Sequence, residues 1–330
     1  MKVLLSDNTY AYLQPGGKNT HITKLLNYHN INGIECKFEN FFESELNPDI
    51  VHFLGFNDIQ RIKLLKKRGK KLILTLIVDE ITNLTGISLI KRRIIILIQS
   101  LLPTRFDRYI NWKALKYFDH IVFMHENDRT TALKRFSINP KKTSVIPHGV
   151  EDIHISKNKN ILAKNQLISV GSITPRKNSA LLAEICCKNN IPIIFIGSSN
   201  KQDEYFKSFI KNVDGNIVKY LDFVSEIDKQ NYFSEAKGFV LLSKGESGCI
   251  AIYEAASFGL PIFISDLPWS FAYPESNLIT RSKINRYDLL TKQLIEWTKK
   301  IDKLKHDKPS FPLLTWKDIS KKYIEVYKSL

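Results

Sequence analysis

The stretch GFVLLSKGESGCIAIYEAASFGLPIFIS, residues 238–265, decides the fold that the sequence predicts. Residues 238–243 and 261–265 are nearly continuous apolar runs, a pattern typical of strands that are buried on both faces. The residues between these runs predict a loop and then a helix that begins near Ile250. A strand, a helix and a second strand in this order form the repeating unit of a parallel α/β sheet.

The same alternation of apolar runs and helical segments extends over the whole chain. In the first part, strands are expected at residues 2–5, 34–40, 49–56, 70–78, 120–124 and 143–147. After a polar, Lys- and Asn-rich linker, the pattern restarts at residues 167–173, 191–197 and 216–224. The sequence therefore predicts two doubly wound parallel-sheet domains.

The C-terminal residues 315–330 predict an amphipathic helix with one apolar face. Thr315 stands where a helix N-cap is expected. The expected apolar face consists of Trp316, Ile319, Tyr323, Val326 and Leu330. Such a face must pack on another part of the protein.

The chain of 330 residues carries a formal net charge of +16. This excess fits an anionic membrane surface, a phosphorylated small substrate or a simple compositional bias toward lysine. Nucleic acid is not expected as a partner, because the sequence offers no aromatic-basic module, helix-turn-helix punctuation or zinc spacing.

The four cysteines predict neither a disulfide framework nor structural zinc, because none has ligand spacing. A reducing cytoplasm is the natural compartment. The opening MKVLLSDNTY is too short for a signal peptide, and no apolar run reaches the ~18–20 residues that span a bilayer. We expect a cytoplasmic protein, soluble or peripheral on the inner face of the cell membrane.

Two carboxylates, Glu246 and Glu254, lie about two helical turns apart in the decisive stretch. The small residues Gly248 and Cys249 precede the helix that begins near Ile250. Free N–H groups at a helix N-terminus bind anions, and a carboxylate accepts hydrogen bonds from a ribose diol. The sequence therefore predicts a nucleoside diphosphate site.

The spacing from Glu246 to Glu254 resembles the E-x7-E signature of glycosyltransferase family 4, retaining enzymes of the GT-B fold. The resemblance implies two Rossmann-like domains facing a cleft, with the C-terminal helix crossing back to the first. The implied domains are residues 1–152 plus 314–330 on the acceptor side and residues 153–313 on the donor side. It further implies a sugar donor linked to UDP or GDP, and a transfer that needs no cofactor. No DxD motif is present, so no essential metal is expected.

A second segment, LISVGSITPRKN (167–178), resembles the family's loop that supplies cations to the donor diphosphate. Lys177 matches the family's lysine. Ser172 stands where the family has an arginine, and Arg176 is the candidate to supply the missing charge. We therefore expect Lys177 and Arg176 to neutralise the leaving diphosphate, with Ser172 beside the donor.

Further segments match the family more weakly. The resemblance implies that Gly16 and Gly17 face the donor phosphate and that Phe223 and Val224 contact the base. The backbone of Gly248, Cys249 and Ile250 would hold the β-phosphate or the sugar. Within the signature, Glu254 would bind the ribose and Glu246 a sugar hydroxyl. The segment VIPHGVED (145–152), with His148 in the family's asparagine position, is expected to be a structural turn.

One departure concerns a histidine that many family members carry near the reaction centre. Ile77 stands where that histidine would fall. His125 or Asp79 is the candidate replacement. The expected catalytic residues are thus Glu246, Lys177, Arg176 and His125.

Residues 88–116 combine a dense apolar stretch with clustered Lys and Arg. Such a segment could lie on an anionic membrane, which would suit a glycan or lipid-linked acceptor in envelope polysaccharide or glycolipid synthesis. A core helix with a basic edge explains it equally well. Two other functions stay open: a catalytically silent GT-B subunit that binds a sugar or a partner, and a sugar-nucleotide epimerase.

Overall fold

The computed structural model describes residues 1–7, 16–40, 47–55, 58–76, 94, 114–136, 138–151, 165–301 and 311–330. The chain divides into two compact units. Unit 1 comprises Met1–Gly149 and Thr315–Leu330, and unit 2 comprises Val150–Leu314. Each unit contains its own six-stranded sheet, and each is described separately below.

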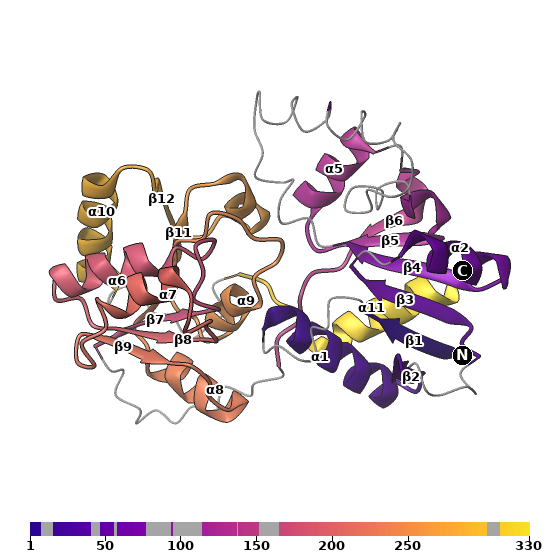
Figure 1. Ribbon diagram of the computed structural model, residues 1–330, viewed down its shortest axis with the longest axis horizontal. Coiled ribbons are helices and arrows are strands. Elements are labelled where there is room, and N and C mark those ends of the chain that lie inside the picture. The colour runs from indigo at the N-terminus through magenta and orange to yellow at the C-terminus, as the bar shows by residue number, and fades with distance from the viewer. Residues whose placement is uncertain are drawn as a thin grey trace. The chain divides into compact units, whose positions relative to one another are not determined.

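The sheet of unit 1 is parallel and has the strand order β2-β1-β3-β4-β5-β6. The strands are β1 (Lys2–Ser6), β2 (Glu35–Phe38), β3 (Ile50–Leu54), β4 (Lys71–Leu76), β5 (His120–Phe123) and β6 (Thr143–Val145). The α-helices are α1 (Gly17–Ile31), α2 (Ile59–Lys67), α5 (Glu126–Arg135) and α11 (Trp316–Lys328), with short 3-10 turns at Leu115–Tyr117 and Pro140–Lys142 (Figure 1).

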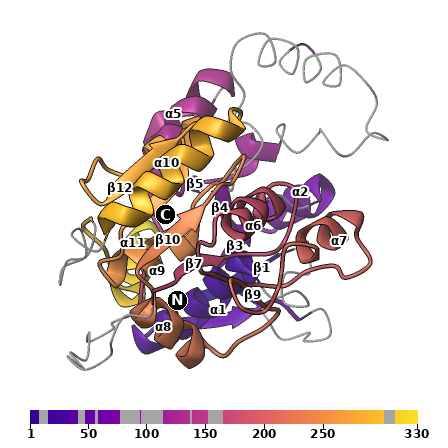
Figure 2. The same cartoon turned by 90° about the vertical axis from the view of Figure 1, so that its left-hand side faces the viewer.

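The sheet of unit 2 is also parallel, with the order β12-β11-β10-β7-β8-β9. Its strands are β7 (Leu167–Val170), β8 (Ile193–Ile196), β9 (Val218–Leu221), β10 (Gly238–Leu241), β11 (Ile262–Ser265) and β12 (Ile279–Ser282). Its helices are α6 (Ser179–Lys188), α7 (Glu204–Ile210), α8 (Glu226–Glu235), α9 (Ile250–Ser257), α10 (Tyr287–Lys300) and a 3-10 turn at Pro268–Ala272 (Figure 2). The parallel α/β architecture expected from the apolar strand runs is confirmed in both units.

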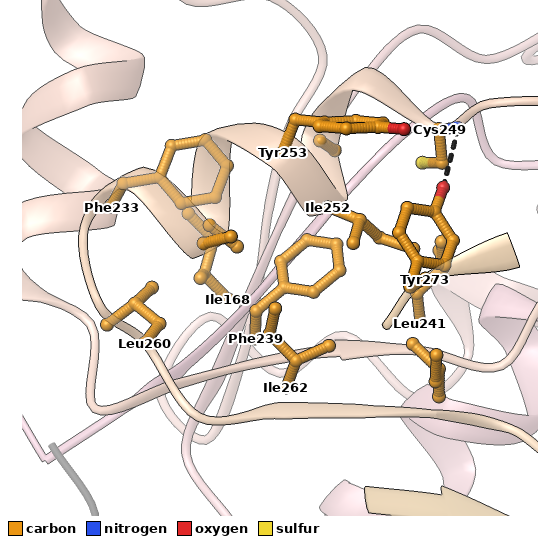
Figure 3. Close-up of a cluster of buried hydrophobic side chains, with 14 of the residues drawn as sticks. Ile168, Phe233, Phe239, Leu241, Cys249, Ile252, Tyr253, Leu260, Ile262 and Tyr273 are labelled. Carbon is orange, nitrogen blue, oxygen red and sulfur yellow. Dashed lines mark hydrogen bonds between the residues drawn. The ribbon is translucent and has the colours of Figure 1, made fainter. Parts of the chain in front are cut away.

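Both faces of the unit 2 sheet are covered by helices, which explains its continuously apolar strands. Phe239 and Leu241 of β10 face one hydrophobic core, which includes Phe233 of α8 (Figure 3). Val240, between them, faces the other core, where Trp297 of α10 packs. Successive strand residues point to opposite faces, so each strand needs apolar side chains at every position.

The order of strands in unit 2 reverses beside β7. Strands β8 and β9 follow on one side of β7, whereas β10 pairs with its other side. The connections that leave the carboxyl ends of β7 and β10 therefore run in opposite directions along the sheet. In doubly wound folds, this switch point is where ligands bind.

The C-terminal helix α11 packs in unit 1 against α1 and the sheet. His29 of α1 bonds through Nδ1 to Ser320 Oγ (2.7 Å) and through Nε2 to Tyr327 Oη (2.9 Å). His52 of β3 lies 2.8 Å from the same Tyr327 hydroxyl through Nδ1 and 2.7 Å from Thr75 Oγ1 through Nε2. A buried network of imidazoles and hydroxyls thus attaches this helix to unit 1.

The apolar face expected for α11 was only partly right. Trp316, Ile319 and Tyr323 are buried as expected, and Thr315 caps the helix by accepting a hydrogen bond from the Asp318 N–H. Val326 and Leu330 are only half-buried, and the buried face instead continues through Ile324 and Tyr327. The reason is the hydroxyl of Tyr327, which finds buried histidine partners that a count of apolar residues does not reveal.

The turn around residue 148 is structural, as expected. His148 is buried, and its Nδ1 lies 2.9 Å from Nδ1 of His21. A side chain at Gly149 would come within 2.8 Å of the Trp316 backbone, so only glycine fits where α11 begins.

Candidate active site

The site centres on an ion cluster at the switch point of unit 2. The loop after β7 carries Arg176 and Lys177, and the loop after the adjacent strand β10 carries Glu246. Lys177 Nζ lies 2.7 Å from Glu246 Oε1, and Arg176 lies 2.9 Å from Glu246 Oε2. Three of the four expected catalytic residues are therefore brought together.

Further hydrogen bonds fix the two loops. Ser243 Oγ donates to Glu246 Oε1 at 2.6 Å, and Arg176 donates to the Gly245 carbonyl at 2.7 Å. The Lys244 N–H in turn donates to the Arg176 carbonyl at 2.8 Å. Backbone and side chain thus hold the carboxylate and the guanidinium in one arrangement.

The charges of the cluster do not cancel. Burial acts to raise the pKa of Glu246, but Lys177, Arg176 and their hydrogen bonds outweigh it and hold that pKa below its usual value. Burial acts to lower the pKa of Lys177, whereas Cys249 and Glu246 raise it, with a net increase. Two cations and one carboxylate are therefore ionised at neutral pH, and one positive charge remains to attract an anion.

The loop after β7 begins with Gly171, where the backbone conformation and the nearby Lys177 side chain favour glycine. Its φ is +150°, and an added Cβ would lie 3.1 Å from Cε and 3.3 Å from Nζ of Lys177. The buried lysine therefore lies directly over the Gly171 backbone. A side chain at residue 171 would be strained at this φ and would force the end of the Lys177 side chain to shift by a few tenths of an ångström.

The start of helix α9 lies beside this cluster. Gly248 has φ +95°, in the left-handed region that favours glycine, and Cys249 is the N-cap. Lys177 Nζ lies 3.7 Å from Cys249 Sγ. The residues expected to hold a phosphate at the helix mouth are thus close to the expected cation.

The helix mouth has a partner that the sequence did not predict. The Cys249 N–H donates a hydrogen bond to the Tyr273 hydroxyl at 3.0 Å (Figure 3). Tyr273 is buried and follows the 3-10 turn after β11. A phosphate that binds this N–H must therefore replace or share the tyrosine hydroxyl.

Glu254, the second carboxylate of the signature, forms an ion pair with a lysine outside the cluster of Lys177, Arg176 and Glu246. It pairs with Lys229 of α8 at 2.8 Å, and both side chains are largely buried. Sequence reasoning missed Lys229, because no local spacing relates α8 to α9.

The residues expected at the base and beside the donor lie in loops of the same unit. Phe223 is 76% exposed and Val224 is packed on a hydrophobic core, both between β9 and α8. Ser172 is half-buried in the loop after β7. Strand β9 is separated from β7 by β8, so Phe223 does not join the ion cluster.

Comparison with known proteins identifies the architecture. The structure resembles sucrose-phosphate synthase of Thermosynechococcus elongatus with a TM-score of 0.71 and 11% identity, covering 100% of this chain and 99% of that one. It resembles HepE of Anabaena, solved in complex with UDP and glucose, with a TM-score of 0.68 and 13% identity, covering 100% of each chain. The fold is GT-B.

Sequence comparisons indicate the class of protein to which this GT-B chain is similar. Residues 151–310 match the family described as Glycosyl transferases group 1. A relative of 29% identity over 173 residues is the UDP-Gal:alpha-D-GlcNAc-diphosphoundecaprenol alpha-1,3-galactosyltransferase of Escherichia coli. That match covers 47% of this chain and 44% of the relative, less than half of either. Both findings support glycosyltransferase as the class.

The expected site residues of the first GT-B domain lie in unit 1. Gly16 is the N-cap of α1 and Gly17 is its first residue, directly at the end of the loop after β1. His125 is the N-cap of α5 after β5, and burial lowers its pKa to about 4, so its ring is neutral at pH 7. Ile77 and Asp79 lie outside the described residues.

Within the described ranges, no cluster of three or more His, Cys, Asp or Glu side chains could hold a metal ion. In the same part of the chain, every helix is too short or too polar to cross a bilayer. Of residues 88–116, only Ile94 and residues 114–116 are described.

Proposed function

We propose that this protein transfers a sugar from a nucleoside-diphosphate sugar to a glycan or lipid-linked acceptor, with retention of the anomeric configuration. The observation that carries the proposal is the ion cluster at the switch point, in which buried Lys177 and Glu246 are joined by the more exposed Arg176. Its net positive charge suits a diphosphate, the group that leaves in such a transfer.

Each group of the site has a role in this proposal. Lys177 and Arg176 neutralise the charge that develops on the leaving diphosphate. Glu246 holds both cations and accepts a hydrogen bond from a sugar hydroxyl. The backbone of residues 248–250 binds the β-phosphate or sugar, Glu254 binds the ribose, and Phe223 with Val224 contacts the base. Ser172, Gly16 and Gly17 line the phosphate.

The chemical step breaks the bond between the anomeric carbon and the diphosphate oxygen. A bond from the acceptor oxygen to the same face of that carbon replaces it. The acceptor proton passes to the departing phosphate, so no protein nucleophile is assigned. His125, neutral at pH 7, is the polar side chain proposed to contact the transferred sugar.

A lipid-linked acceptor is supported by the Escherichia coli relative, whose name specifies a diphosphoundecaprenol-linked acceptor. The basic and apolar sequence of residues 88–116 supports docking on an anionic membrane surface at the inner face of the cell membrane. Flotation with anionic vesicles at low and high salt tests this. Binding at low salt that is lost at high salt supports docking, and no binding at low salt contradicts it.

The experiment for the main proposal is a transfer assay on the purified chain with UDP- and GDP-linked sugars, with donor hydrolysis as a second readout. Turnover that Glu246→Gln abolishes supports the enzyme. Nucleotide binding with neither transfer nor hydrolysis supports the second candidate, a catalytically silent subunit. That candidate is favoured by Ser172, which stands where the family's arginine would be.

A further inference from the structure

Lys229 forms an ion pair between two helices that no motif connects. Its ammonium group lies 2.8 Å from Glu254 Oε1 on α9 and 2.9 Å from Glu226 Oε1 on its own helix α8. The side chains of Lys229 and Glu254 are 14% and 18% exposed, whereas Glu226 is 53% exposed. The inter-helix contact is therefore the better shielded of the two, and charged pairs are strongest where water is excluded.

The surrounding structure fixes this pair. One turn further along each helix, Phe233 of α8 stacks on Phe258, directly after α9, with ring centroids 5.7 Å apart and an interplanar angle of 12°. Residues four apart lie on one face of a helix, so the ion pair and the ring stack are consecutive contacts of the same junction. The first turn of α8 is also fixed, because Ser225 Oγ accepts a hydrogen bond from the Asp228 N–H.

The positive charge of Lys229 is stable at neutral pH. Burial acts to lower the pKa of Lys229, but Glu254 and Glu226 raise it above its usual value. Lys229 therefore remains an ammonium group. This ammonium group donates to one oxygen of Glu254, and an ionised carboxylate has further lone pairs that can accept hydrogen bonds from a ligand.

We propose that Lys229 is a positioning residue that holds Glu254 as an oriented acceptor for the 2′- and 3′-hydroxyls of the donor ribose. This inference rests on the proposed function, in which Glu254 binds the ribose. Because Phe223 and Val224 lie just before Ser225, the N-cap of α8, Lys229 also ties the proposed base-contacting loop to the proposed ribose-binding helix. The protein then distinguishes a ribonucleotide from its 2′-deoxy counterpart, and this discrimination depends on Lys229.

The test is calorimetric titration of UDP, GDP and ADP into the full chain, followed by titration of the 2′-deoxy form of whichever nucleotide binds. The wild type is expected to prefer the ribonucleotide by about tenfold, as for one charge-assisted hydrogen bond. Lys229→Met should weaken ribonucleotide binding by about this factor and leave the deoxynucleotide within about twofold. Lys229→Arg should retain most of the discrimination.

Two further variants separate positioning from local helix stability. Lys207→Met removes an exposed pair with Glu204 at the same i, i+3 spacing on α7 and should change neither affinity. Glu226→Gln removes only the exposed partner of Lys229 and should retain discrimination. Thermal melts show whether each variant is folded.

The outcomes are distinguishable. If the wild type binds none of the three nucleotides, the proposed function fails and the inference fails with it. If the wild type binds a ribonucleotide and its deoxy form equally, only the inference is overturned. Tighter ribonucleotide binding by Lys229→Met would also overturn it, since Lys229 would then compete with the ribose for Glu254.

Discussion

The ammonium group of Lys177 lies 2.7 Å from a carboxylate oxygen of Glu246, although these residues belong to loops after different strands. Both side chains are buried, so neither charge is screened by water. The two strands, β7 and β10, are neighbours in the sheet. The contact therefore joins the two sequence motifs from which a donor site was predicted.

Glu246→Gln should separate binding from turnover. The variant leaves the buried Lys177 without its counter-charge, so the free energy of unfolding should fall by about 3 kcal/mol. Turnover should fall at least ~100-fold, the scale for losing one such polar contact in a transition state. Nucleoside diphosphate binding should not weaken, because the net positive charge rises. Chemical denaturation, transfer assays and calorimetry measure these quantities.

Glu275→Gln is the control for this variant. Its carboxylate pairs with Arg281 and is 82% exposed, so stability and turnover should not change. A Glu246→Gln protein with wild-type turnover would exclude Glu246 from the catalytic machinery.

Tyr273→Phe should lower the stability of the ligand-free protein and increase its affinity for a nucleoside diphosphate. Loss of the hydroxyl leaves the buried Cys249 N–H unsatisfied, at a cost of about 1–3 kcal/mol. A bound phosphate can restore that hydrogen bond, so nucleoside diphosphate affinity should increase several-fold. Melting temperatures with and without the nucleotide measure both effects. Tyr287→Phe, at an exposed tyrosine, is the control. Weaker binding by Tyr273→Phe would show that the hydroxyl itself contacts the donor.

Stability should fall steeply between pH 6.5 and pH 4.5. Burial lowers the pKa of His21 and His52 to about 3 and of His29 and His125 to about 4. Above pH 6.5 these rings are neutral in both states. As the pH falls below 6.5, only the unfolded chain takes up protons, so each ring reduces stability by about 1.4 kcal/mol per pH unit.

Denaturant titrations at several pH values measure this slope. In His52→Gln, one fewer proton should be taken up on unfolding, so the free energy of unfolding should change less steeply with pH than in the wild type. Equal stability at pH 5 and pH 7 would contradict the buried neutral network beneath α11.

Activity should survive removal of divalent metal ions. In the proposed mechanism, Lys177 and Arg176, which lie together at Glu246, supply the positive charge that a metal ion would otherwise provide to the leaving diphosphate. Transfer assays with and without EDTA measure this, with Mg²⁺ and Mn²⁺ added back as the control. A loss of turnover in EDTA that either ion restores would contradict it.

The sequence predicted the parallel α/β class because the strands are buried on both faces, as Phe239, Val240 and Leu241 illustrate. The motifs around Lys177 and Glu246 each have a local signature, so the resemblance to a known family placed both residues at one site, and the structure brings them into contact. Contacts between residues without a local signature could not be predicted. Tyr273 reaches Cys249, and Lys229 reaches Glu254, only through tertiary packing.

The C-terminal helix illustrates the same limit. The periodicity of residues 315–330 predicted a helix with a buried face, and Thr315 was correctly placed as its cap. The buried face includes Tyr327 because its hydroxyl forms hydrogen bonds with His29 and His52, which lie on other elements. Most polar side chains in a protein core have such hydrogen-bond partners.

The most direct test of the central claim compares a nucleoside diphosphate with its monophosphate, in the wild type and in Lys177→Met. Calorimetry with UDP and UMP, and with the GDP and ADP pairs, gives the four affinities of each cycle. Because Lys177 is proposed to contact the diphosphate, the wild type should bind at least one nucleoside diphosphate about tenfold or more tightly than the corresponding monophosphate. Lys177→Met should lose most of that preference for the diphosphate. If no diphosphate binds, or if the preference is unchanged in Lys177→Met, the assignment of this cluster to a sugar-nucleotide donor is wrong.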